Sequence, residues 1–265
     1  MLRQRIITAV ALLAVLAGVV LFLPPPGALI TLTLAISLGI WEWSQFLGLK
    51  SLLWRLLYVV VVLASMLAVW LYSFQPGALQ LVLQITLAWW LVVFVWVTRF
   101  PTAIPMAVGF LSGFLVLVPA WLALSRLLGA ENGVAWVVFV LLVVWATDIG
   151  AFAVGKLFGR IKLIPRVSPG KTWEGAIGGI ALATIVAFAG ALYFKQDPLS
   201  FVSLCVAVSV ISVIGDLIVS IFKRHNGLKD SGQIFPGHGG MLDRIDSICS
   251  AAPVFVLGLS WQGLV

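Results

Sequence analysis

Charged residues are scarce in this sequence. Asp, Glu, Lys and Arg make up 9% of the 265 residues, whereas a soluble domain carries roughly 25%. Apolar residues make up 62%, so a water-soluble fold is excluded and a membrane protein is indicated. Cysteine is also rare, and Cys205 and Cys249 both lie in apolar runs. We interpret them as small buried hydrophobic residues rather than as a disulfide or a metal site.

The charge that is present is mostly positive, with a formal net charge of +7. In a soluble protein this excess would point to nucleic acid. In a membrane protein basic loops instead determine topology and can face anionic lipid or nucleotide, so no nucleic-acid partner is predicted. The sequence has no internal repeat, which disfavours a transporter built from inverted repeats.

Long apolar runs predict an all-α polytopic membrane protein with about nine transmembrane helices. A helix needs about 20 apolar residues to cross the bilayer core, and nine windows of that length are separated by proline, glycine and polar residues. The first window follows Arg3 and Arg5 and is too long for a signal-peptide core, so it is interpreted as a retained helix. The windows are roughly 4–23, 28–48, 52–74, 78–98, 104–125, 133–155, 174–194, 198–222 and 246–264.

The basic residues predict the orientation of these helices. With nine spans, Arg126 and Lys195 fall on one side and the other basic residues fall on the side of the N-terminus. Positively charged loops stay in the cytoplasm, so the N-terminus is predicted to be cytoplasmic and the C-terminus to lie outside. The residues on the cytoplasmic side are Arg3, Arg5, Lys50, Arg55, Arg99, Lys156, Arg160, Lys162, Arg166, Lys171, Lys223, Arg224, Lys229 and Arg244.

Acidic residues divide the chain into two regions. Residues 1–130 hold helices 1 to 5 and carry few ionisable groups between the helix ends, apart from Glu42, which we interpret as an interfacial residue between two tryptophans. Residues 131–265 hold helices 6 to 9 and the predicted cytoplasmic loops 156–173 and 223–245. A carboxylate inside a membrane is costly and usually marks function, so this second region is predicted to be catalytic. Its acids on the cytoplasmic side are Asp148, Glu174, Asp216, Asp230, Asp243 and Asp246.

The segment from Ser220 to Asp246 has the composition of a phosphate and metal site. Lysine and arginine suit phosphates, and glycines let backbone N–H groups approach an anion closely. Asp243 and Asp246 are three residues apart at a predicted helix start, so their oxygens could hold a divalent metal, for which Mg²⁺ is the favoured ion. Asp216, Ser220 and Lys223 share one helix face, although an Asp216–Lys223 ion pair that only holds helices together would give the same spacing.

A second polar segment ends at the predicted start of helix 7. Ser168 and Lys171 are candidate phosphate contacts there, because the first amides of a helix favour anions. The run Gly170-Lys171-Thr172 lacks the first glycine of a P-loop and does not match that motif. A basic loop that merely anchors topology would explain the charges but not the Ser-Pro-Gly-Lys-Thr turn.

These motifs resemble those of the phosphatidate cytidylyltransferase (CDP-diacylglycerol synthase) family, over about the last 120 residues. The main run consists of Ser220, Lys223, Arg224, Lys229, Asp230, His238, Gly239, Gly240, Asp243, Arg244 and Asp246. The resemblance extends back to Gly215 and Asp216, to Ser168, Pro169, Lys171, Thr172, Glu174 and Gly175, and to Asp148, Gly150 and Ala151. A run of that length with fixed gaps is specific.

The resemblance implies an enzyme that joins CTP and phosphatidate into CDP-diacylglycerol and pyrophosphate. It implies Mg²⁺, with or without a second cation, in the cytoplasmic mouth of a cavity in a bacterial inner membrane, and it is compatible with a homodimer. Asp216, Asp243 and Asp246 are the expected metal ligands, and they share the catalytic role with Lys223 and Arg224. The expected substrate-binding residues are Ser168, Lys171, Thr172, Ser220, Lys229, Asp230, His238, Gly239, Gly240 and Arg244.

Three other interpretations remain open from the sequence. A related CTP-dependent enzyme could act on another lipid, as a CDP-archaeol synthase or a polyprenol kinase does, because no tail-contact pattern is readable in helices 1 to 5. An ion-coupled transporter would also use Asp148 and Asp216 but should place its site near the membrane midplane. A structural membrane protein would need no phosphate cluster.

Overall fold

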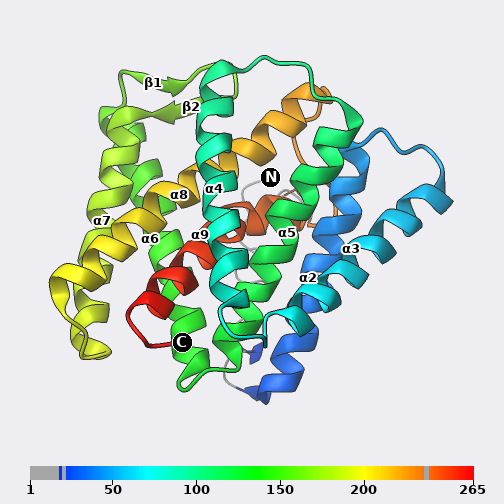
Figure 1. Ribbon diagram of the computed structural model, residues 1–265. Coiled ribbons are helices and arrows are strands. Elements are labelled where there is room, and N and C mark those ends of the chain that lie inside the picture. Colours follow the sequence, from blue (N-terminus) through cyan, green and yellow to red (C-terminus); the bar gives the residue numbers. More distant parts are fainter. Residues whose placement is uncertain (1–17, 20–21, 236–238) are drawn as a thin grey trace.

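The computed structural model describes residues 18–19, 22–235 and 239–265, and these residues are mainly helical (Figure 1). The N-terminal helices are α2 (Pro25–Phe46), α3 (Leu52–Tyr72), α4 (Ala78–Arg99) and α5 (Met106–Leu128). The C-terminal helices are α6 (Gly133–Phe158), α7 (Trp173–Tyr193), α8 (Pro198–His225) and α9 (Leu242–Trp261). The eight helices predicted from 28–48 onward are thus confirmed, and the first window, 4–23, lies mostly outside the described residues.

Seven of the described helices, α2 to α8, are long and apolar enough to cross a membrane. This confirms an integral membrane protein but not the predicted number of nine spans. Helix α9 is not among the seven, because Asp243, Arg244 and Asp246 occupy its first turns and lower its hydropathy. The chain begins two of these helices with proline at the first helical positions, in α2 and α8, where the missing N–H costs nothing.

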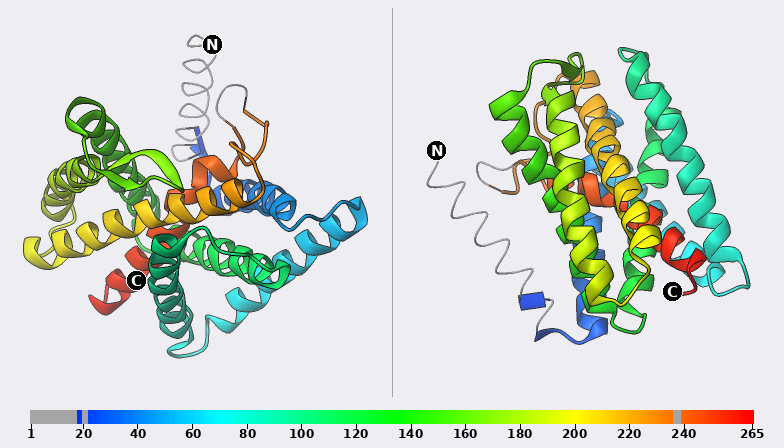
Figure 2. Two further views of the ribbon diagram at one scale, coloured as in Figure 1. Left: turned by 90° about the horizontal axis from the view of Figure 1, so that it is seen from above. Right: turned by 90° about the vertical axis from the view of Figure 1, so that its left-hand side faces the viewer.

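Helix α9 lies at the centre of the bundle. It contacts α2, α4, α5, α6 and α8, and most of its residues are buried, from Leu242 at one end to Leu259 at the other (Figure 2). Helix α3 is the opposite case: Tyr58, Val62 and Met66 are its buried residues, and its other faces expose leucine, valine and tryptophan. In a membrane protein such apolar surface faces lipid. The polar start of α9 therefore lies inside protein, and α3 lies at the lipid boundary.

The segment between α6 and α7 corrects the sequence analysis, which predicted a loop over 156–173. Helix α6 continues to Phe158, and the remainder forms an antiparallel hairpin of β1 (Lys162–Ile164) and β2 (Ser168–Thr172). The amide of Trp173 also donates to the Ile161 carbonyl at 2.9 Å. Strands of three and five residues are too short to show an alternating pattern, so the sequence does not reveal them.

Glycines let α6 and α7 approach each other closely, above all Gly175 and Gly179 of α7. A Cβ atom added at either position would collide with a backbone oxygen of α6, that of Ala151 or of Thr147 respectively. Gly150 on α6 meets the backbone of α7 in the same way. This close crossing fixes the part of α6 that carries Asp148 against the helices that follow.

The connections with many basic residues gather at one end of the bundle. In Figure 1 the hairpin, the α4–α5 connection and the end of α8 lie at the top, whereas the α3–α4, α5–α6 and α7–α8 connections lie at the bottom. Arg126 and Lys195 belong to the bottom end, and Arg99 and Lys171 belong to the top. The arrangement of the helices therefore agrees with the partition of charge derived from the sequence.

Candidate active site

A polar pocket of about 280 Å³ lies where α6, α8, Asp230 and the start of α9 meet. The acids and bases that line it come from parts of the chain up to a hundred residues apart. Its lining residues are Asp148, Asp216, Lys223, Asp230, Asp243, Arg244, Asp246 and Ser247. The structure thus brings together all three predicted metal ligands, together with Lys223, Asp230 and Arg244.

The α8 side of the pocket is organised around Asp216. Lys171 of the hairpin pairs with this carboxylate at 2.6 Å, and the Ser220 hydroxyl, one turn along the helix, donates to it at 3.3 Å. Lys171 also reaches the Val213 carbonyl at 3.5 Å. The predicted proximity of Asp216 and Ser220 on one helix face is confirmed. The alternative Asp216–Lys223 ion pair is not formed, because the cation of Asp216 comes from the hairpin.

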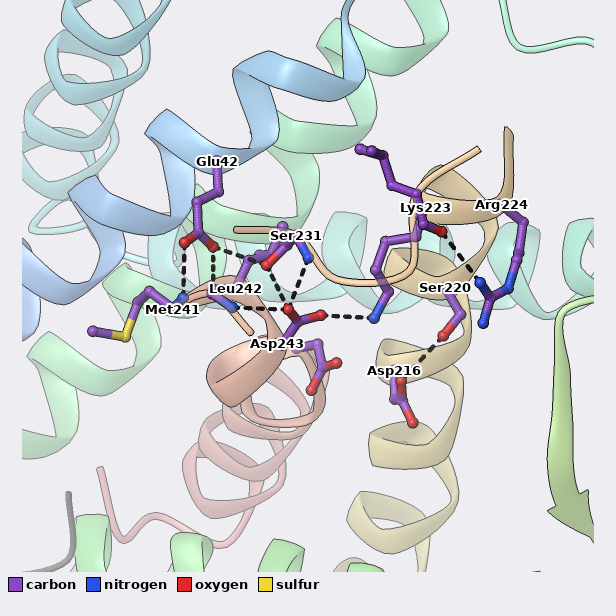
Figure 3. A network of polar contacts seen from close by, with 12 residues as sticks. Glu42, Asp216, Ser220, Lys223, Arg224, Ser231, Met241, Leu242 and Asp243 are labelled. Atoms are coloured by element: carbon purple, nitrogen blue, oxygen red, sulfur yellow. Dashed lines mark hydrogen bonds and ion pairs between the residues drawn. The ribbon is translucent and has the colours of Figure 1, made fainter. Parts of the chain in front are cut away.

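The α9 side is organised around Asp243 (Figure 3). Lys223 pairs with its Oδ1 atom at 2.7 Å. Its Oδ2 atom accepts from the Ser231 amide at 2.8 Å, from the Ser231 hydroxyl at 2.9 Å and from the Gly240 amide at 3.0 Å. Asp243 thus ties α8, the segment before α9 and α9 itself together at one carboxylate.

The glycine turn before α9 has a different partner from the one expected. The sequence analysis interpreted its N–H groups as donors to a substrate phosphate, but the Gly240 amide donates to Asp243. Gly239 has φ +79°, a left-handed conformation that glycine adopts without strain, and it forms a bridge with Phe235. His238, the predicted substrate contact between them, lies outside the described residues. The Gly240 amide therefore binds an anion of the protein itself.

Asp148 and Asp246 both lie within electrostatic reach of Asp216. Asp246 is 8% exposed and accepts from the Ser247 amide at 2.7 Å. Carboxylates gathered around one pocket favour positive charge. Two lysine side chains provide part of that charge by pairing with Asp216 and Asp243.

The oxygen ligands of the pocket fit a Mg²⁺ site that the protein shares with a substrate. Within the described residues, no three or more His, Cys, Asp or Glu side chains form a group that could hold a metal ion by themselves. Mg²⁺ seldom uses such an all-protein cage, because it binds through one or two carboxylates and completes its shell with water and substrate phosphates. The pocket offers hard oxygen ligands next to lysine and arginine, which matches a metal that is shared with a phosphate substrate.

Other predicted residues do not line the pocket. Arg224 donates to the carbonyls of Val167 and Leu228, at 3.4 and 3.2 Å, and so joins the hairpin to the segment after α8. The Thr172 hydroxyl accepts from the Gly175 amide at 3.1 Å and caps the start of α7. Ser168, Ser220, Lys171 and Lys229 are likewise not among the lining residues.

Sequence reasoning missed Glu42. It was interpreted as an interfacial residue, which is wrong, because its exposure is 1% and its carboxylate accepts hydrogen bonds from the start of α9 and from Ser231. The signal that could have identified it is a lone carboxylate inside an apolar helix, since such a group needs partners in the protein. Ser231 was missed as well, and nothing in its sequence context distinguishes it.

Comparison with known proteins places this site in a family. The model of the cytidylyltransferase family matches residues 3–261, which include every residue that lines the pocket. The chain belongs to the cytidylyltransferase family. This match extends over the N-terminal helices as well, where the sequence alone showed only membrane spans.

Several relatives carry a more specific name. The chain is 39% identical to a phosphatidate cytidylyltransferase of Haemophilus influenzae, over 96% of this chain and 97% of that protein. It is 40% identical to a phosphatidate cytidylyltransferase of Pseudomonas aeruginosa, over 98% of this chain and 97% of that protein. A Staphylococcus haemolyticus protein of the same name is 44% identical over 127 residues, which are 47% of this chain and 48% of that protein.

Proposed function

We propose that this protein is a phosphatidate cytidylyltransferase that transfers the cytidylyl group of CTP to phosphatidate in phospholipid biosynthesis. The products are CDP-diacylglycerol and pyrophosphate. The observation that carries the proposal is the similarity to two bacterial enzymes of that name over nearly the whole length of both chains. The pocket agrees with the reaction, because it gathers carboxylates with a lysine and an arginine between membrane helices.

The chemistry needs little from the protein beyond positioning. The second pKa of a phosphomonoester is about 6, so the phosphatidate nucleophile is mostly ionised at neutral pH and no side chain has to remove a proton. A phosphatidate oxygen forms a bond to the α-phosphorus of CTP, and the bond from that phosphorus to the bridging oxygen of the β-phosphate breaks. The protein has to align two polyanions and offset the charge that grows on pyrophosphate.

The residues in and around the pocket have separate roles in binding the phosphates and the metal. Lys223 and Arg244 line the pocket and bind phosphate oxygens, and Lys171 and Arg224 add positive charge at its edge. Asp216, Asp243 and Asp246 stay predictions as ligands of Mg²⁺, with or without a second cation; one or two of them would hold the ion together with water and substrate phosphates. The metal would supply Lewis-acid stabilisation of the phosphates. Ser168, Thr172, Ser220, Lys229, Asp230, His238, Gly239 and Gly240 stay predictions as substrate contacts. The Thr172 hydroxyl also caps α7, and the Gly240 amide also donates to Asp243.

The same proposal includes a topology. Nine spans, with the first at 4–23 and the last in α9, put the N-terminus and the pocket on the cytoplasmic side of a bacterial inner membrane. The gathering of basic connections at one end of the bundle supports this orientation. Gly170→Cys and Lys195→Cys test it, because both positions are exposed and the native Cys205 and Cys249 are buried. An impermeant thiol reagent should label position 170 from the cytoplasm and position 195 from outside. Labelling of both from one side contradicts the topology.

The assay of function uses purified protein in detergent with Mg²⁺, CTP and phosphatidate. Pyrophosphate release that requires all three is the expected result, and its absence would overturn the proposal. Release of CDP instead, with a polyprenol acceptor, identifies a kinase, because that reaction breaks the bond to the γ-phosphate. Faster pyrophosphate release with an ether-linked archaeal acceptor identifies a different lipid substrate. The homodimer stays a prediction from the resemblance, which cross-linking in native membranes tests.

A further inference from the structure

Glu42 is a buried carboxylate that no step of the proposed reaction uses. It lies on α2, and the backbone amides of Met241 and Leu242 donate to it at 2.9 and 2.7 Å (Figure 3). The Ser231 hydroxyl donates to the same carboxylate at 2.9 Å. These contacts join α2 to residues about 190 to 200 positions later in the chain. Glu42 therefore holds the start of α9 from outside the catalytic region.

The part of α2 that carries Glu42 is itself fixed. The Trp43 indole donates to the Gly109 carbonyl of α5 at 3.0 Å, and its ring lies 4.8 Å from that of Phe222 on α8. The Asn226 side chain, at the end of α8, donates to the Phe46 carbonyl at 3.3 Å. Helix α2 is thus held by α5 and α8, so Glu42 is presented by a rigid support.

The segment before α9 closes tightly around this carboxylate. A Cβ atom added at Gly232 or at Gly240 would collide with the carboxylate of Glu42. Two of the glycines in the segment are therefore required by the approach of Glu42, and Gly240 also donates its amide to Asp243. One short segment is shaped by two carboxylates, one from α2 and one from α9.

Ser231 connects these two carboxylates directly. Its hydroxyl lies 2.9 Å from Glu42 Oε2 and 2.9 Å from Asp243 Oδ2. The hydroxyl has a single hydrogen and both neighbours are acceptors, so the two carboxylates share one donor. The orientation of Asp243 therefore depends on where Glu42 holds Ser231.

We propose that Glu42 is a positioning residue, which sets the orientation of Asp243 through Ser231 and the first amides of α9. The expected effect on the reaction rate rests on the proposed function, whereas the expected effect on the structure before α9 does not. Glu42 does not line the pocket, so it acts through Asp243 rather than on the substrates. Partners that orient metal-binding groups typically change metal affinity or activity by about 10- to 100-fold when removed.

The test compares Glu42→Gln with Ser44→Ala. Glutamine keeps the shape but loses one acceptor oxygen, so it cannot accept from both α9 amides and from Ser231. Ser44 lies on the same helix with 0% exposure, yet its hydroxyl contacts Arg55 and Trp41 rather than the segment before α9, which makes it a matched control. Hydrogen–deuterium exchange of peptides covering 228–245 is measured without substrates, and pyrophosphate release is measured against Mg²⁺ concentration.

We expect faster exchange over 228–245 in Glu42→Gln and a rise of about 10-fold in the Mg²⁺ concentration needed for half-maximal rate. Ser44→Ala should change neither. Wild-type exchange in Glu42→Gln, or an equal effect of Ser44→Ala, overturns the inference. If Glu42→Gln does not fold, Ser231→Ala replaces it, because it removes the hydroxyl that joins Glu42 to Asp243 and leaves the α9 amides paired with Glu42. Lack of pyrophosphate release by the wild type would overturn the proposed function, while exchange would still decide the role of Glu42.

Discussion

The α8 side and the α9 side of the pocket use the same chemical groups in different ways. Each has an aspartate paired with a lysine, at 2.6 Å for Asp216 and Lys171 and at 2.7 Å for Asp243 and Lys223. The Asp216 side chain is 28% exposed, whereas that of Asp243 is 8% exposed and accepts three further hydrogen bonds from Ser231 and Gly240. Asp243 is thus occupied with organising the protein, and Asp216 keeps more capacity for a ligand.

The largest effect is expected from Asp243→Asn. The asparagine amide would face a donor on one side, and Lys223, whose side chain is 11% exposed, would lose its partner. Breaking a buried ion pair by removing one partner costs about 3–5 kcal/mol, so both activity and the unfolding temperature in detergent should fall sharply. The double variant with Lys223→Met removes the unpaired charge and should regain part of the lost stability while staying inactive. Equal instability of the two variants would contradict the buried-pair interpretation.

Asp216→Asn should separate activity from stability. The substitution removes a predicted metal ligand, and we expect kcat to fall by about 100-fold or more, the scale on which loss of a transition-state stabiliser acts. Because the Asp216–Lys171 pair is partly exposed, its loss should cost at most about 1 kcal/mol, and the unfolding temperature should change little. Thermal unfolding and steady-state rates of the same preparation check this. A drop in stability as large as that of Asp243→Asn would erase the distinction between the two sides.

Lys171→Met tests a smaller part of the comparison. If Lys171 binds a CTP phosphate in addition to pairing with Asp216, the KM for CTP should rise by about 10-fold, because a charge-assisted hydrogen bond contributes about 1.5–3 kcal/mol. Lys171→Arg keeps the charge and should restore part of the affinity. The unfolding temperature should stay close to that of the wild type. An unchanged KM for CTP would mean that Lys171 serves Asp216 alone.

The sequence predicted the helices well because each is an apolar run of membrane length between breaks. It also predicted which acids and bases share the site, since Asp216, Lys223, Asp243 and Asp246 stand at helical spacing or at a helix start. The sequence did not predict which lysine pairs with which aspartate, because the pairing depends on how the hairpin folds back over α8.

Contacts between distant parts of the chain could not be predicted from the sequence either. The hydrogen bond from Ser231 to Glu42 joins residues 189 positions apart, and no local pattern records it. The hairpin was missed because its strands are short. The contact of the Gly240 amide with Asp243 was not foreseen, because a carboxylate and a phosphate accept N–H groups equally well. In each case the type of chemistry was readable from the residues, and the partner was not.

Thr172→Ala should give the smallest effect and decides between two roles for one hydroxyl. The sequence predicted a substrate contact, whereas the structure uses this hydroxyl to accept from the Gly175 amide at the start of α7. Loss of such a cap costs about 1 kcal/mol, so the unfolding temperature should fall slightly while the KM for CTP stays within about twofold of the wild type. Thr172→Ser keeps the hydroxyl and should retain the cap. A clear rise in the KM for CTP, without loss of stability, would instead give Thr172 a direct role and add a second hairpin residue, next to Lys171, to the α8 side of the site.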